Sequence, residues 1–105
     1  MVDEELTPEE LIEQIKRLRV SDVLLSTLST VAQLGYTKLE RAHRDLDQAK
    51  LAIESLRALI PVLDNAVPAE TVRDFSQVVA NLQLAYAAAV AEERELDAEG
   101  ESTPD

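Results

Sequence analysis

The chain has no cysteine and no tryptophan, and its 105 residues include only two glycines, four prolines, two tyrosines and one phenylalanine. Without cysteine, neither a disulfide framework nor a zinc site built on thiolates can hold the fold together. The scarcity of glycine and proline, together with many alanines and leucines, favours helices. We therefore predict an all-α fold that depends on side-chain packing.

Long apolar runs are also absent, since the longest, residues 84–91, has eight residues and is mostly alanine. A transmembrane helix needs about 20 apolar residues. The first six residues are acidic, whereas a secretory signal begins with basic residues and continues with apolar ones. We expect a cytoplasmic protein that does not bind membranes.

Basic residues are outnumbered by acidic ones, and the formal net charge is −11. Residues 1–20 hold six acids against three bases, and residues 92–105 hold seven against one. Charge concentrated at the ends is typical of solubilising tails and disfavours direct binding to nucleic acid. We predict an acidic N-terminal tail at residues 1–6, one helical domain at residues 7–96 and a disordered acidic tail at residues 97–105.

The clearest positive signal is a three-four spacing of apolar residues, which places one seam along a helix. Its members are Leu39, Ala42, Leu46, Ala49, Ile53, Leu56, Ile60 and Leu63. The seam favours a helix start near Thr37, although Asp45 is a competing N-cap. Pro61 should end or kink this helix, because proline removes a backbone donor.

A matching seam follows a short connection at residues 64–67, and Pro68 suits the first turn of the last helix. Its members are Val72, Phe75, Val79, Leu82, Tyr86 and Ala89. Glu93 then occupies the next seam position, so the seam fades. Two helices with matching seams and a short connection predict an antiparallel helical hairpin.

The first third of the chain predicts further helix. Thr7 can cap a helix and Glu10 completes a capping box. An apolar face follows, made of Leu11, Ile12, Ile15 and Leu18. Ser21 and Asp22 offer a second cap, and Gly35 is a natural helix stop. Residues 8–34 form either one bent helix or two, so the fold is a small bundle of three to four helices built on the hairpin.

The third helix also carries a second apolar stripe, made of Leu51, Ala52, Ala58 and Leu59. Two stripes indicate neighbours on two sides: residues 23–34 can cover one, and the last helix or a second subunit the other. We therefore predict a non-enzymatic interaction module that forms a homodimer or binds a partner helix. The residues assigned to its interaction or packing seam are Leu46, Ile53, Leu56, Ile60, Phe75, Leu82 and Tyr86.

Three segments in this order resemble the bacterial DUF1844 family over about residues 20–90: STLSTVAQLG at residues 26–35, LDQAK at residues 46–50 followed by Ile53, Glu54 and Leu56, and LQLAY at residues 82–86. Residues 63–68 depart from the turn that many members have, and Glu54 stands where members commonly have Asp. The resemblance implies a small helical cytoplasmic protein of unknown function without assigned catalytic residues. Gene neighbourhoods of some relatives contain translation initiation factor 3 and ribosomal proteins, which implies a link to translation with the ribosome or a translation factor as partner.

Few residues can carry chemistry. Glu40 and the only histidine, His43, have the i, i+3 spacing that di-iron carboxylate bundles use, so a ferritin-like metal protein is the alternative function. The pair flanks the seam, which favours a solvated surface pair and no cofactor. The basic ridge Lys38, Arg41 and Arg44 can bind RNA or an acidic partner, or can be neutralised by nearby carboxylates or the protein's own acidic tails; the last two outcomes are favoured.

Overall fold

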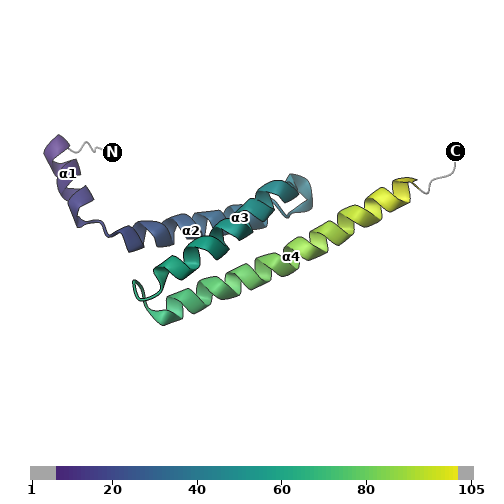
Figure 1. Ribbon diagram of the computed structural model, residues 1–105. Helices are drawn as coiled ribbons and strands as arrows, with labels where there is room; N and C mark the ends of the chain where they lie inside the picture. Colours follow the sequence, from purple (N-terminus) through teal and green to yellow (C-terminus); the bar gives the residue numbers. More distant parts are fainter. Residues whose placement is uncertain (1–6, 102–105) are drawn as a thin grey trace.

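The computed structural model describes residues 7–101, with residues 99–101 described as backbone only. Its helices are α1 (Pro8–Arg17), α2 (Val20–Thr37), α3 (Leu46–Leu59) and α4 (Ala69–Glu101) (Figure 1). Two short 3₁₀ helices, η1 (Arg41–His43) and η2 (Ile60–Leu63), flank α3. No strand occurs in this part of the chain, so the prediction of a small all-α bundle is confirmed.

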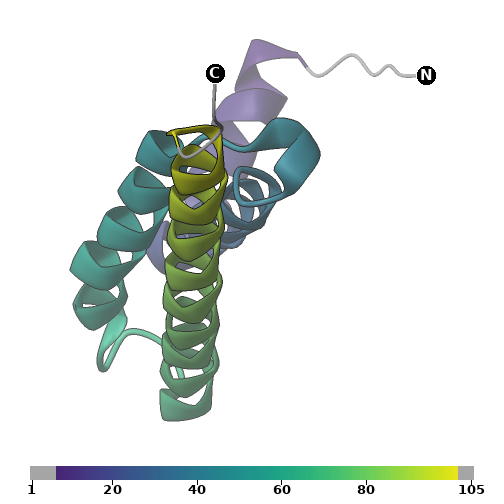
Figure 2. The same cartoon turned by 90° about the vertical axis from the view of Figure 1, so that its right-hand side faces the viewer.

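Helices α2, α3 and α4 pack lengthwise against one another (Figures 1 and 2). The short connections at both ends of α3 make it antiparallel to α2 and to α4, and α3 and α4 form the predicted helical hairpin (Figure 1). α1 lies off one end of this bundle, and the last turns of α4 extend beyond the other end. The described molecule is therefore elongated, with extents of 70 × 36 × 17 Å.

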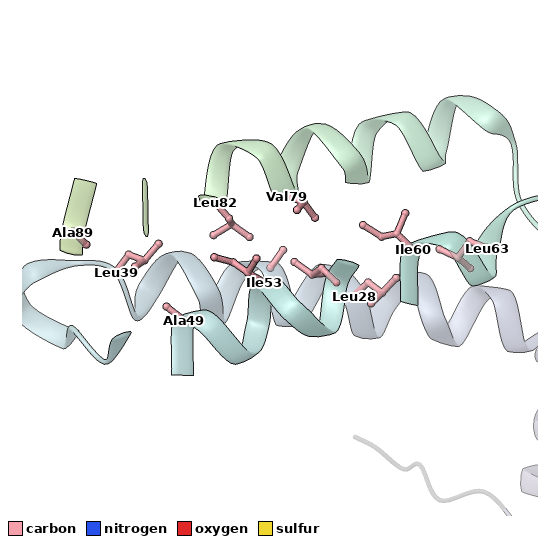
Figure 3. Close-up of a cluster of buried hydrophobic side chains, with 11 residues drawn as sticks. Leu28, Leu39, Ala49, Ile53, Ile60, Leu63, Val79, Leu82 and Ala89 are labelled. Carbon is pink, nitrogen blue, oxygen red and sulfur yellow. The ribbon is translucent and has the colours of Figure 1, made fainter. Parts of the chain in front are cut away.

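The core runs along the bundle and consists of apolar side chains (Figure 3). Four leucines in it have no exposed surface, namely Leu28, Leu56, Leu63 and Leu82. Burying one such side chain stabilises the fold by about 1.5–3 kcal/mol. No polar or charged side chain is buried within the described residues, so the interior is entirely apolar.

The predicted start of the third helix near Thr37 is wrong, because α3 begins only after Asp45. The Asp45 carboxylate accepts a hydrogen bond from the backbone N–H of Gln48 at 3.2 Å, which caps the helix. The first two seam residues consequently lie outside the helix. Leu39 still reaches the core from the turn after α2, whereas Ala42 is exposed.

The prediction that Gly35 stops its helix is also wrong. α2 continues to Thr37, and no glycine in the described residues has a positive φ. Gly35 is buried where α2 packs against α3: a Cβ at this position would lie 3.1 Å from the Cβ of Ala52 and 3.4 Å from a methyl group of Leu82. The missing side chain therefore allows close approach of the two helices.

The first third of the chain forms two helices, which settles the question that the sequence left open. The predicted capping box is present: the Thr7 hydroxyl accepts from the Glu10 N–H at 3.1 Å, and the Thr7 N–H donates to the Glu10 carboxylate at 3.0 Å. The predicted cap at residues 21–22 is wrong, because α2 begins at Val20. Its N-cap, Arg19, has an extended backbone and makes no side-chain cap hydrogen bond.

The helix boundaries in the second half of the chain agree in part with those predicted from the sequence. α3 ends at Leu59 and gives way to η2 at Ile60, just before Pro61, as predicted. Asn65, in the turn before α4, has a φ of 69°, a left-handed conformation that asparagine tolerates. The predicted disordered tail is wrong for residues 97–101, which continue α4 because alanine and glutamate favour helix. Residues 1–6 and 102–105 of the predicted tails lie outside the described residues.

Candidate interaction site

Helix α1 presents an apolar face that the rest of the described chain leaves uncovered. Its members Leu11, Ile12 and Ile15, together with the C-cap Leu18, have exposed fractions between 48% and 59%. No residue of α1 is buried. An uncovered apolar face of this kind is a candidate surface for association.

Local interactions explain why α1 forms, but they do not supply the packing that stabilises most helices. Besides the capping box, Lys16 and Arg17 lie in the last turn, where positive charge is favourable. The helix ends because Leu18 and Arg19 adopt extended backbone conformations. An isolated helix shorter than about 12–15 residues is only marginally stable in water, and α1 has ten. Packing against another surface would therefore stabilise α1.

A second apolar surface is the groove between α2 and α3, which we call the α2–α3 groove. It has a volume of about 190 Å³. Its lining residues are Val31 and Leu34 of α2, Lys38 at the C-cap of α2, and Gln48, Leu51, Ala52 and Ser55 of α3. Leu34 and Leu51 are 52% and 54% exposed, so the groove presents large apolar side chains to solvent.

The second stripe predicted on the third helix is divided between the core and this surface. Ala52 is buried next to Gly35 of α2. Leu51, Ala58 and Leu59 remain exposed. α3 thus has helical neighbours on two sides, α2 and α4, as predicted, and still leaves apolar surface uncovered.

The residues predicted as the interaction or packing seam lie inside the bundle. Four are buried, namely Ile53, Leu56, Ile60 and Leu82, and the other three, Leu46, Phe75 and Tyr86, are half-buried against the same core. These side chains hold α2, α3 and α4 together. They are therefore packing residues, and the surface open to another molecule lies elsewhere.

The α1 face is a functional candidate that the sequence pattern alone does not single out. Periodicity shows which residues share a helix face, but it does not show whether a neighbouring helix covers that face. The sequence signal that does exist is the shortness of the segment between the Thr7 cap and the break at Leu18.

The candidate metal pair lies in the turn between α2 and α3, and not on a regular α-helix. Glu40 precedes η1 and His43 ends it, and both are exposed. The backbone N–H of His43 donates to the backbone carbonyl of Glu40 at 3.0 Å, as a 3₁₀ turn requires. Within residues 7–101, no three His, Asp or Glu side chains gather to hold a metal ion.

Two arginines of the basic ridge bind carboxylates of α4. Arg41 Nη2 donates to Glu92 at 2.6 Å, and Arg44 Nη1 donates to Glu92 at 2.8 Å and to Glu93 at 3.3 Å. Arg44 Nη2 also donates to the Leu39 carbonyl at 2.8 Å. These two members of the ridge are therefore neutralised by the chain's own acidic C-terminal helix, while the third member, Lys38, lines the α2–α3 groove.

The same contacts perturb the ionisation of the cluster. Hydrogen bonds from Arg41 and then from Arg44 lower the pKa of Glu92 from 4.5 to about 2. Glu92 in turn raises the pKa of both guanidinium groups. A carboxyl group with so low a pKa is a poor general acid or base near neutral pH. The cluster is therefore a structural link between α4 and the turn after α2.

Comparison with known proteins assigns the chain to no family. The chain matches no family model, no curated protein and no solved structure. The resemblance to DUF1844 and the cytoplasmic location accordingly stay predictions. Among the described residues, no helix combines the length and the hydropathy needed to cross a membrane.

Proposed function

We propose that this protein is a non-enzymatic interaction module, which uses the apolar face of α1 to bind another helical surface. The observation that carries the proposal is the exposure of that face on a helix of only ten residues. A helix of this length gains its stability from packing. A partner supplies the surface that the described chain does not.

The three-helix bundle acts as the scaffold for this helix. Its core is closed around fully buried leucines, so it does not need α1 for its own packing. Only Leu18 and Arg19 separate α1 from α2, and α1 is thereby held at one end of the bundle (Figure 1). The scaffold limits the orientations of α1 and so lowers the entropy lost on binding.

The arrangement of the potentially reactive side chains favours a binding function over a catalytic one. A nucleophilic or acid–base site needs groups within hydrogen-bond reach of one another. The side-chain hydrogen bonds of the described residues cap helices, lie within single helices, lie within the turn after α2 or join that turn to α4, and none involves the side chain of His43. The ferritin-like alternative needs ligands beyond Glu40 and His43, and no observation in residues 7–101 favours it.

A pair of substitutions in α1 tests the proposal. Ile15→Asp places a charge within the apolar face, whereas Gln14→Asp makes the same change in net charge beside Glu10 and Arg17 on the polar side. The wild-type and variant chains are compared by sedimentation velocity, which detects self-association. They are also used to capture binding proteins from cells of the native organism, and each captured protein is then purified and its binding to each chain is measured. We expect wild type and Gln14→Asp to bind the same partner with similar affinity. Ile15→Asp should lower that affinity at least about tenfold.

Thermal unfolding followed by circular dichroism provides the control for folding. No residue of α1 is buried, so the bundle of Ile15→Asp should unfold at the wild-type temperature. The proposal fails if wild type binds nothing, itself included, or if Ile15→Asp keeps every wild-type association.

A further inference from the structure

We infer that the partner of α1 is a second copy of this chain, whose α2–α3 groove receives the apolar face of α1. The inference rests on the proposed function and adds the identity of the partner. Its starting point is that one chain carries both an uncovered apolar helix and an uncovered groove between two helices.

The two surfaces match in length and character. Leu11 to Leu18 covers about 10 Å of chain, and Val31 to Lys38 covers about the same length of α2. The apolar residues of the groove come from both of its walls, with Leu34 on α2 and Leu51 on α3. A short amphipathic helix laid between two helices completes the kind of packing found in four-helix bundles.

The charges of the two surfaces are complementary. Lys38 is the only charged residue that lines the groove, and it lies at the C-terminal end of α2. α1 carries its carboxylates at its start, with Glu9 and Glu10 in the first turn and Glu13 in the second. Placing the start of α1 next to Lys38 pairs opposite charges and fixes the direction of the bound helix.

The α1 helix of the same chain cannot occupy the groove. If α1 folds back on its own chain, the short link at Leu18 and Arg19 brings Ile15 level with about residue 22 of α2. Leu34 lies about 21 Å along α2 from its start at Val20, beyond the reach of the ten residues of α1. An α1 helix that fills the groove therefore comes from another molecule.

A two-fold dimer covers the apolar face of α1 and the α2–α3 groove on both copies at once. Each copy donates its α1 and receives the α1 of the other, so the same patch is buried on both subunits. Such an exchange is closed and leaves no α1 free to recruit a third copy.

Oligomeric state tests the inference. We expect wild type to sediment as a dimer, and we expect Ile15→Asp and Leu34→Asp each to weaken the dimer at least about tenfold. Both side chains are more than half exposed, so neither change should disturb the bundle. Leu84→Asp is the matched control: Leu84 is 72% exposed on α4, outside both surfaces, and its substitution should leave the dimer intact.

Cross-linking tests which surfaces meet, because the chain has no native cysteine. A copy with Ile15→Cys is mixed with a copy with Leu34→Cys and treated with a short bifunctional thiol reagent. We expect a covalent product that contains both copies. The pair of Ile15→Cys with Leu84→Cys should give none.

Two results overturn the inference: wild type that remains monomeric at high micromolar concentration, or a dimer that Leu34→Asp leaves intact. If wild type is a monomer but binds a different purified protein through Ile15, the proposed function stands and only the inference is wrong. If Ile15→Asp alters no association at all, both are wrong.

Discussion

The contact between Gly35 and Ala52 sets how closely α2 and α3 pack. A Cβ added at residue 35 would meet the Ala52 Cβ at 3.1 Å, and that atom is fixed to a helix backbone and cannot rotate away. The next nearest atoms belong to Leu82, which is itself fully buried. A methyl group at residue 35 therefore forces the helices apart or displaces a core leucine.

We predict that Gly35→Ala lowers the free energy of unfolding by up to about 2 kcal/mol. Overpacking costs about 1–3 kcal/mol, and the better helix propensity of alanine returns about 1 kcal/mol. Adding Ala52→Gly to Gly35→Ala should restore the space between the helices. Urea unfolding of wild type, the two single variants and the double variant should therefore give a coupling free energy between the two positions of about 0.5–3 kcal/mol. Strictly additive effects would show that the two positions do not meet.

Among the helices, the link from α4 to the turn after α2 is the main long-range polar contact. The Arg44 side chain is 13% exposed and binds both Glu92 and Glu93. Arg41 adds a second, more exposed contact to Glu92. The link holds α4 beyond the point at which its apolar seam ends, close to Ala89.

This link should depend on pH. The pKa of Glu92 is lower in the folded protein than in the unfolded chain, so the stabilisation is present above about pH 4.5 and is lost as the pH falls toward about 2. Glu92→Gln should therefore lower the melting temperature at neutral pH and make little difference at the acidic limit. Glu95→Gln, an exposed change on the same helix, is the control. A Glu92→Gln effect of equal size at both pH values would contradict the link.

Local signals predict most of the helices. The capping box at Thr7 and Glu10, the break at Pro61 and the seam of α4 depend on residues within a few turns of one another, and the structure confirms them. The start of α3 is missed because Leu39 continues the spacing of the seam from a turn outside the helix. Gly35 is misread because its role depends on Ala52, which lies on another helix.

The candidate site is less predictable than the helices. The sequence identifies the apolar face of α1, but whether a helix covers that face depends on the tertiary arrangement. The partners of Arg44 are similarly inaccessible to local patterns, because Glu92 lies 48 residues further along the chain. The nearer carboxylate Asp45 instead caps α3.

The described part of the molecule is more extended than a compact domain of similar length. Its radius of gyration is 19.5 Å, whereas a compact domain of 100 residues has a value of about 13 Å. The excess arises because α1 lies off one end of the bundle and the last turns of α4 project from the other (Figure 1). This elongated shape leaves the apolar face of α1 accessible to the proposed partner.

The most direct test of the central claim is hydrogen–deuterium exchange of residues 12–17 in the full-length chain, measured from dilute to concentrated solution and with any purified partner. We expect fast exchange in the dilute chain, because a ten-residue helix is marginal alone, and at least about tenfold slower exchange on association. The buried parts of α2, α3 and α4 serve as the internal control and should not change. Protection of residues 12–17 that is already complete in the dilute chain, or that appears under no condition, would contradict the claim that α1 is a helix presented for binding.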